Sequence, residues 1–196
     1  DLVYLPIWTE VKGRLNEFDN LKNIFFIGGY NHIPNVDAVK YFVNEIWPFV
    51  IKELQDIEFH IIGTNAPNDI KEINVKGVKF VGFVPSLDDV FGKYRLSVAP
   101  LRYGAGQKGK LVTSMCYGIP SVATDIAVEG MGLTDLKEVI IKNNPLDIAK
   151  SIIEIYSNKT LWYEISKHSI EFAKNNFSEE SVVHKIERIF NYKINE

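Results

Sequence analysis

The stretch RLSVAPLRYGAGQKGKLVTSMCYGIPSVATD, residues 95 to 125, decides the fold, because it contains the pattern of a strand, a loop, a helix and a second strand. Residues 95 to 101 form an apolar run of strand length. The loop that follows is rich in glycine and lysine. We expect a helix from about residue 107 to residue 117, ended by Gly118, and a short strand over residues 119 to 124. This order predicts a parallel βαβ unit.

Apolar runs alternate with helical patterns along most of the chain. Strands are predicted over residues 23 to 28, 58 to 63, 78 to 84, 95 to 101, 119 to 124 and 138 to 142. Long helices are predicted from Pro34 to about Val50, with a distortion at Pro48, and over residues 107 to 117, 146 to 157, 161 to 175 and 179 to 192. Short helices are expected at residues 69 to 73 and after Ser86, which is placed to cap one. The pattern predicts an α/β fold: a Rossmann-like parallel sheet flanked by helices, with C-terminal helices.

The composition indicates one domain with a sizeable core, or one domain with an appendage. The chain has 196 residues, of which 46% are hydrophobic. Its 22 Lys and Arg residues against 25 Asp and Glu residues give a net charge of −3, which is no footprint for nucleic acid. No apolar run approaches the roughly 20 residues that a membrane span requires. The single cysteine, Cys116, excludes an internal disulfide and is expected to be a core residue in a reducing, cytosolic setting.

Glycines stand where a parallel sheet binds its ligands, at the carboxyl ends of the strands. The strand patterns end in, or lead into, Gly28-Gly29, Gly63, Gly82 and Gly104. After the last of these, the loop amides and the positive end of the following helix are expected to face one anion, and Lys108 and Lys110 add positive charge. Together these features suit a diphosphate. The alternative, a tight connection with two solvated lysines, stays open.

Other kinds of site are not indicated by the sequence. The glycine-rich loop lacks the spacing of a Walker A motif, and no GxGxxG follows the first strand, which weighs against a nicotinamide cofactor. The four histidines are scattered, so no metal site and no cofactor is expected. His32 follows the first strand and is expected to face the cleft, whereas His60 alternates within a strand and is expected to be structural. His168 and His184 are expected to be exposed on helices.

Several segments resemble the donor-binding domain of retaining glycosyltransferases with the GT-B fold, in the large family that includes sucrose synthases and lipopolysaccharide glucosyltransferases. The opening segment is NIFFIGGYNHIPNVDAVKYFVNEIWPFV, from residue 23. FHIIG, VKFVGFVPSLDDVF, YRLSVAPLRYGAGQKGKLVTSMCYGIPSVATDIAVEGM and FAKNNFS follow in that family's order. The resemblance covers residues 23 to 178, and the stretch from Val98 to Gly130 is its most specific part.

The resemblance implies one half of a GT-B fold, which has two Rossmann-like domains that face a cleft. It implies that this chain is the C-terminal, nucleotide-sugar-binding domain, and that an N-terminal acceptor-binding domain is missing. Residues 1 to 22 would then be the lead-in or linker from that domain, residues 23 to 178 the donor-binding domain, and residues 179 to 196 a helix that crosses back.

The resemblance also assigns candidate site residues by position. It implies diphosphate binding by Gly104, Ala105, Gly106, Lys108 and Lys110. It implies contacts to the ribose or the base by Thr113, Val81, Gly82, Phe83 and Val84. Further donor contacts are expected from Gly29, His32 and Glu129.

Three positions depart from the family's pattern. Many members carry a pair of glutamates, the second of which holds the ribose hydroxyls; here Thr113 stands in its place, with a neutral group and a shorter reach. Ala105 stands eight positions earlier, where a subset of the family has a GAGxKxK loop in place of the first glutamate. A basic residue often follows the first strand, and only His32 is found there. These departures predict weaker donor binding, because charge-assisted hydrogen bonds are stronger than neutral ones.

The expected function is transfer of a sugar from a UDP- or GDP-sugar to an acceptor hydroxyl, without metal and with retention, in the synthesis of a cell-envelope polysaccharide. The expected location is cytoplasmic, and attachment to the inner face of the membrane through the missing half stays open. A degenerate module that binds only a nucleotide or a partner stays open, as does a sugar-nucleotide epimerase of GT-B fold. A glycogen-type phosphorylase lacks support, and an unrelated reductase is disfavoured by the absent dinucleotide motif.

Overall fold

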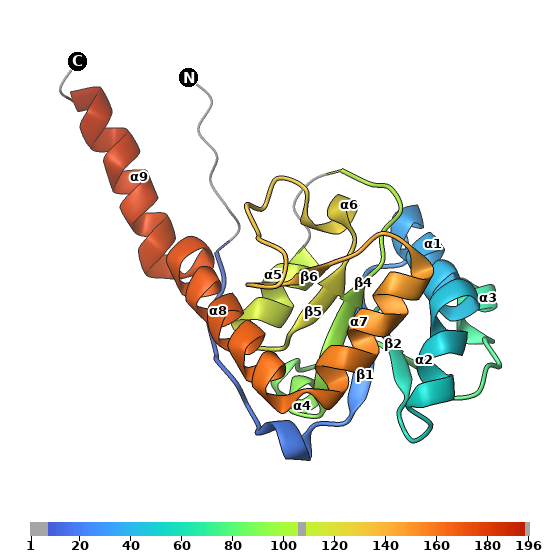
Figure 1. Cartoon of the computed structure of the whole chain (residues 1–196). Helices are drawn as coiled ribbons and strands as arrows, with labels where there is room; N and C mark the ends of the chain where they lie inside the picture. Colours follow the sequence, from blue (N-terminus) through green and yellow to red (C-terminus); the bar gives the residue numbers. More distant parts are fainter. Residues whose placement is uncertain (1–7, 106–108, 195–196) are drawn as a thin grey trace.

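Six parallel strands form the centre of the part of the molecule that the computed structural model describes, residues 8–105 and 109–194 (Figure 1). Their order across the sheet is β3-β2-β1-β4-β5-β6. The strands are β1 (Asn23–Ile27), β2 (Phe59–Ile62), β3 (Val78–Gly82), β4 (Tyr94–Ala99), β5 (Ser121–Ala123) and β6 (Ile140–Ile141). Each of them lies within, or overlaps, a strand that the sequence predicts. The predicted fold class, an α/β protein with a Rossmann-like parallel sheet, is confirmed.

The central strand β1 is apolar on both faces, as a strand in a sheet covered on both sides must be. Ile24, Phe25 and Phe26 are all buried. Ile24 and Phe26 belong to the large core, whereas Phe25 packs with Phe91 and Tyr94 in a smaller cluster on the other face. Because β2 pairs with one edge of β1 and β4 with the other, the strand order reverses at β1. Open parallel sheets bind ligands at such a switch point.

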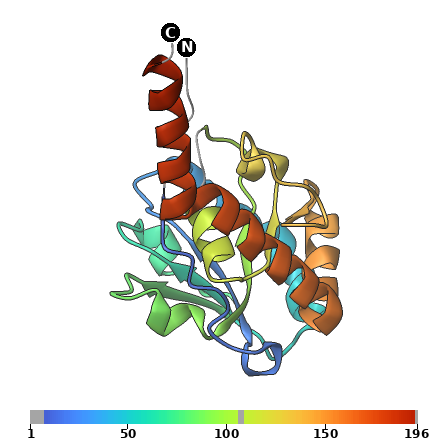
Figure 2. The same cartoon turned by 90° about the vertical axis from the view of Figure 1, so that its left-hand side faces the viewer.

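Helices cover both faces of the sheet (Figures 1 and 2). The longer elements are α1 (Ile33–Tyr41), the π-helix η2 (Phe42–Ile46), α2 (Trp47–Glu53), α5 (Gly109–Cys116), α7 (Pro145–Ser157), α8 (Lys159–Phe177) and α9 (Glu179–Ile194). The shorter ones are η1 (Phe18–Asn20), α3 (Asn68–Lys71), α4 (Asp88–Phe91) and α6 (Asp125–Val128). α7 packs against η2 and α2, and α8 packs against α5. Each predicted helix is present, with small shifts at its ends.

Pro48 explains why the first long helix is interrupted. Proline has no N–H to donate and its ring collides with the carbonyl four residues earlier. The chain widens into the π-helix η2 just before this point, and α2 then begins with Pro48 in its first turn, where proline is tolerated. The predicted distortion is therefore confirmed, but it lies on the N-terminal side of the proline.

One detail differs from the sequence-based expectations: Leu87, not Ser86, is the N-cap of α4, and it makes no side-chain cap. Phe18 and Leu21, in the segment predicted as a lead-in, are buried in the main core. Cys116 is buried as expected, and burial raises the pKa of its thiol to about 11, which makes it an inert core residue.

The C-terminal helix α9 projects from the body of the molecule (Figures 1 and 2). It contacts α8 through its first turns, where Val182 is buried. Within residues 8–105 and 109–194, no helix has the length and apolar character that crossing a membrane would demand.

Candidate functional site

A pocket of about 360 Å³ opens at the carboxyl ends of β1 and β2, beside the first turns of α5. Its lining residues are Ile27, Gly28, Gly29, Asn35, Gly63, Thr64, Lys110 and Thr113. They come from the end of β1, from the loops after β1 and β2, and from helices α1 and α5. This is the edge of the sheet at which the sequence predicted a ligand, and three predicted site residues, Gly29, Lys110 and Thr113, line the pocket.

Gly63, which follows β2, lets the loops after β1 and β2 pack closely together at the wall of the pocket. A Cβ added at Gly63, where φ is +138°, would lie 1.8 Å from the carbonyl oxygen of Gly28. The Gly63 N–H donates to the Gly82 carbonyl at 2.8 Å, so the ends of β2 and β3 are joined as well. Around Gly29, in contrast, an added Cβ would meet nothing within 4 Å. The backbone at Gly29 is therefore open to a close approach by a ligand.

The glycine-rich loop begins beside α1. A Cβ at Gly104, where φ is +117°, would lie 3.3 Å from Pro34 Cγ and 3.8 Å from His32 Cε1. His32 is the exposed N-cap residue of α1, so the structure brings the predicted residues His32 and Gly104 close together, although neither of them is among the residues that line the pocket. Ala105 is exposed next to Gly104, whereas Gly106 and Lys108 lie outside the described residues.

Two side chains fix the start of this loop. Arg102 Nε donates to Asp37 Oδ2 at 2.9 Å, and the guanidinium carbon lies 4.8 Å from the centre of the Tyr41 ring on α1. The hydrogen bond to Asp37 holds the pKa of Arg102 above its usual value. On the other side, the Thr124 hydroxyl donates to the Leu101 carbonyl at 2.6 Å. These contacts fix Leu101 and Arg102, the residues at which the loop begins after β4.

Helix α5 directs a lysine and a threonine into the pocket. Lys110 Nζ lies 5.5 Å from the centre of the Phe26 ring, which places the ammonium over the end of β1. The Thr113 hydroxyl donates to the Gly109 carbonyl at 2.8 Å, one turn earlier in the helix. Its proton is therefore already used, and the hydroxyl oxygen presents only lone pairs to a ligand.

The other predicted donor contacts lie outside this pocket. Val81 and Phe83 are exposed beside the end of β3, and 69% of Phe83 is accessible. Gly82 is buried, and Val84 packs against the smaller core cluster. Glu129 is exposed at the end of α6, after β5. Phe83 follows β3, which lies next to β2, whereas Glu129 follows β5, which is separated from β1 by β4.

The sequence did not single out Asn35 or Thr64 as site residues. Asn35 is buried in the first turn of α1, where an asparagine carries no signal of a binding role. Thr64 follows Gly63, and its carbonyl accepts the Tyr30 N–H at 2.9 Å. Only the close packing of the β1 and β2 loops reveals both residues. Among the described residues, no three His, Cys, Asp or Glu side chains gather as metal ligands would.

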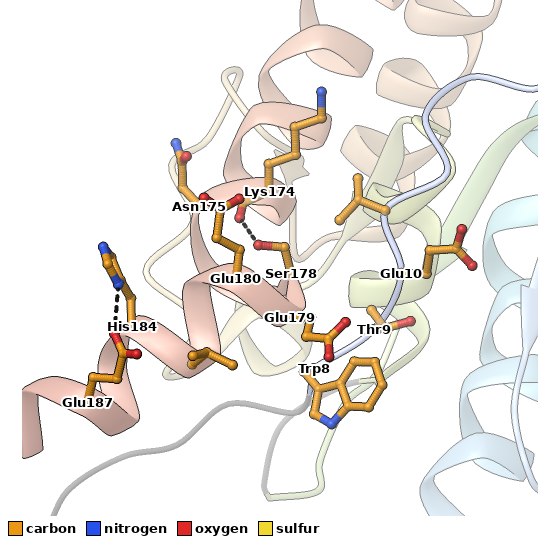
Figure 3. A pocket seen from close by; sticks show the side chains of 12 residues that line it. Trp8, Thr9, Glu10, Lys174, Asn175, Ser178, Glu179, Glu180, His184 and Glu187 are labelled. Atoms are coloured by element: carbon orange, nitrogen blue, oxygen red, sulfur yellow. Dashed lines mark hydrogen bonds and ion pairs between the residues drawn. The ribbon is translucent and has the colours of Figure 1, made fainter. Parts of the chain in front are cut away.

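A larger hollow of about 880 Å³ lies elsewhere, between residues 8–11 and the junction of α8 with α9 (Figure 3). Four glutamates line it: Glu10, Glu179, Glu180 and Glu187. They outnumber the single lysine, Lys174, and the nearby His184 is paired with Glu187 at 3.3 Å. So many carboxylates repel a diphosphate, which favours the smaller, lysine-bearing pocket as the site for an anion.

Proteins of known sequence and structure resemble the chain over most of its length. A curated relative, the "Uncharacterized 44.6 kDa protein in cps region" of Klebsiella pneumoniae, is 28% identical over 193 residues, which are 93% of this chain and 49% of that protein. The chain therefore spans about half the length of this relative.

Two solved structures share the fold. A mutant of S. aureus TarM, in complex with fondaparinux, alpha-GlcNAc-glycerol and UDP, has a TM-score of 0.73 at 22% identity, over 96% of this chain and 38% of that chain. The C-terminal domain of LpcC, a glycosyl transferase group 1 family protein from Francisella tularensis, has a TM-score of 0.67 at 17% identity, over 81% of this chain and 87% of that chain.

The family model described as Glycosyl transferases group 1 matches residues 21–158, which include every strand of the sheet and the whole pocket. The chain belongs to the glycosyl transferases group 1 family.

Proposed function

We propose that this chain binds the nucleotide-sugar donor of a glycosyltransferase, with the diphosphate in the pocket at the ends of β1 and β2. The observation that carries the proposal is the meeting of open glycine backbone at Gly29 with Lys110 on α5. Backbone amides and an ammonium that are held in place stabilise an anion without having to reorganise. The fold supports this position, because the pocket lies at the switch point of the sheet.

In this proposal the protein acts mainly on the leaving group. As the acceptor hydroxyl attacks the anomeric carbon, the bond to the nucleoside diphosphate breaks and negative charge grows on the departing phosphate. Lys110 and the amides of the first turn of α5 counter that charge. Lys108 and Gly106 would assist from the part of the loop outside the described residues. Phe83 offers an exposed ring at the end of β3 for the base.

Other parts of the proposal concern the whole protein. The acceptor would be held by an N-terminal domain that this chain, at 49% of the Klebsiella protein, does not include. The presence of UDP in the TarM complex supports UDP as the nucleotide, and the cps region named for the Klebsiella relative supports a role in polysaccharide synthesis. Retention, independence of metal and a cytoplasmic location remain parts of this proposal.

Calorimetric titration of the chain with UDP and UDP-sugars tests the donor site. Lys110→Ala should weaken binding of UDP about ten-fold, because it removes a charge-assisted contact. Lys150→Ala is the matched control, since Lys150 is exposed on α7, away from the pocket. Equal affinity of the Lys110→Ala variant and the unchanged chain would contradict the assignment of the diphosphate to this pocket.

A second candidate function is a degenerate module that binds nucleotide weakly or serves only a partner. The bond from the Thr113 hydroxyl to the Gly109 carbonyl favours it, because this hydroxyl has no proton left to donate. Thr113→Glu distinguishes the two: a donor site should gain affinity for UDP, since a carboxylate accepts hydrogen bonds from ribose hydroxyls more strongly. A chain that binds no UDP with either residue would support the degenerate module.

A further inference from the structure

Asn35 is a buried polar residue whose hydrogen bonding is incomplete. Only 5% of its surface is exposed, and its Oδ1 atom has no hydrogen-bond partner among the described residues. An unpaired buried acceptor lowers stability, so a native protein that keeps one needs a reason for it. The other such atom is Arg95 Nε, which is stacked between two aromatic rings. Asn35 has no such explanation, and it lines the pocket.

The side-chain amide of Asn35 contacts the loop after β1. Its Nδ2 donates to the Gly29 carbonyl at 2.8 Å, and the His32 N–H donates to the same oxygen at 3.2 Å. A Cβ at Gly28 would lie 2.7 Å from Nδ2, so the amide occupies the space that a side chain would need there. Asn35 therefore holds the Gly28 and Gly29 backbone in one orientation.

That orientation determines where the Gly29 N–H points. The Gly28 carbonyl faces Gly63, which directly follows β2, because a Cβ at Gly63 would almost touch its oxygen. In a trans peptide the N–H points opposite to the carbonyl, and the described chain has no cis peptide. The Gly29 N–H therefore points away from β2, toward the side of β1 on which β4 lies. The glycine-rich loop and α5 follow β4 in the chain.

We propose that Asn35 is a positioning residue of the donor site, which orients the Gly29 N–H toward a phosphate oxygen of the bound diphosphate. This inference rests on the proposed function of the pocket. It deepens that function by naming the side chain that fixes the Gly29 backbone, which the proposed function places beside the diphosphate. It also explains why the Oδ1 atom of Asn35 is unpaired: this residue orients the loop after β1, and that role outweighs the stability that the unpaired acceptor costs.

The test compares Asn35→Leu with Asn44→Leu, which replaces an exposed asparagine further along the same helical segment. Asn35→Leu should weaken binding of both UDP and inorganic pyrophosphate about ten-fold, measured by competition against a labelled UDP. Its urea midpoint should be equal or higher, because an apolar side chain of similar size removes the unpaired acceptor and the Gly29 carbonyl keeps its bond from the His32 N–H. Asn44→Leu should leave affinity unchanged.

Asn35→Asp provides a second, isosteric variant, which also serves if the leucine variant does not fold. An ionised aspartate has no proton for the Gly29 carbonyl, whereas a protonated one donates again. The ratio of its UDP affinity to that of the unchanged chain should rise as the pH falls toward the range in which the carboxyl is protonated. A purely structural role predicts no such recovery of binding.

Three results would overturn the inference while leaving the proposed function intact. The first is that Asn35→Leu binds UDP as tightly as the unchanged chain does. The second is that Asn35→Leu loses affinity for UDP but not for pyrophosphate. The third is that the ratio of UDP affinities of Asn35→Asp and the unchanged chain does not change with pH. If the unchanged chain binds neither UDP nor pyrophosphate, the proposed function itself fails.

Discussion

Gly29 and Gly63 line the same pocket but differ in the room around them. Gly63→Ala places a methyl group against the Gly28 carbonyl at a positive φ, so it should lower the free energy of unfolding by more than about 3 kcal/mol. Gly29→Ala meets no neighbour and should change stability by less than about 0.5 kcal/mol, while its methyl group, in the pocket, weakens UDP binding. Urea unfolding and calorimetry of both variants check this. Equal stability of the two would show that the wall is not closely packed.

For single residues, the sequence predicts the structural role of a glycine better than it predicts which polar groups bond to each other. Gly63 and Gly104 end strand patterns, and both adopt positive φ in the structure. Asn35 could not be found in this way, because its importance depends on a carbonyl six residues earlier and on Gly28 packing against its amide. Thr113 was found only by the family resemblance. Its internal hydrogen bond to Gly109 depends on the exact start of the helix.

Among the elements, β4 is tied to η1 and α7 through Arg95. The guanidinium carbon lies 4.0 Å from the Phe18 ring centre and 4.3 Å from that of Tyr156, and its nitrogens donate to the carbonyls of both residues. Arg95→Lys removes the planar stack and one of the two donors. It should lower the free energy of unfolding by about 2 kcal/mol, against no change for Arg188→Lys on the exposed part of α9. Equal unfolding midpoints would show that the stack does not stabilise the fold.

Strands β2, β3 and β4 are linked by side chains around His60, which is structural as predicted. His60 Nδ1 lies 2.8 Å from the Tyr94 hydroxyl and its Nε2 lies 2.9 Å from Glu58 Oε2. A hydrogen bond from Lys79, which has the largest effect, and a second from His60 lower the pKa of the Glu58 carboxyl from its usual value of 4.5. The stabilisation that these hydrogen bonds give the folded state is fully present above the unfolded-state pKa of 4.5. It is lost as the pH falls through the lower pKa that Glu58 has in the folded state.

Glu58→Gln should therefore be less stable than the unchanged chain at pH 7, and the difference should shrink below about pH 4.5. Unfolding by urea at a series of pH values measures it. A difference that stays constant, or grows, on acidification would contradict the assigned cause of the pKa shift.

Element order and type follow closely from hydrophobic periodicity, since each buried strand is a short apolar run ended by a glycine or a turn. The exact first and last residues of the elements do not follow from this periodicity. The π-helix η2 lies where Pro48 follows a segment whose large apolar side chains, Phe42 and Trp47 among them, are buried, and no local pattern encodes it. The short helix α6 was not predicted; its N-cap is Thr124, whose hydroxyl also donates to the Leu101 carbonyl.

At the scale of the whole molecule, α9 contributes little to the folded body. Among residues 179–190 of α9, whose burial the structure describes, Val182 is the buried hydrophobic residue, and one such side chain is worth about 2 kcal/mol. Removal of residues 179–196 should therefore lower the free energy of unfolding by no more than about 2 kcal/mol and leave UDP affinity unchanged. Removal from residue 159 onward deletes the fully buried Trp162 and should unfold the chain. Loss of UDP binding on the shorter truncation would contradict a site at β1 and β2.

The pocket is a property of the whole fold, because it draws on segments from Ile27 to Thr113 that meet only when β1, β2 and β4 are paired. The sequence predicts the edge of the sheet at which it forms and its positive charge. It does not predict that a larger hollow lies elsewhere, beside α9, nor that this hollow is lined by glutamates.

A crystal structure of the chain with UDP tests the central claim most directly. We predict that the diphosphate lies within hydrogen-bond distance of the Gly29 N–H and the first turn of α5, with Lys110 turned toward it. UDP bound in the hollow between residues 8–11 and α9, or bound with its phosphates away from both segments, would contradict the account.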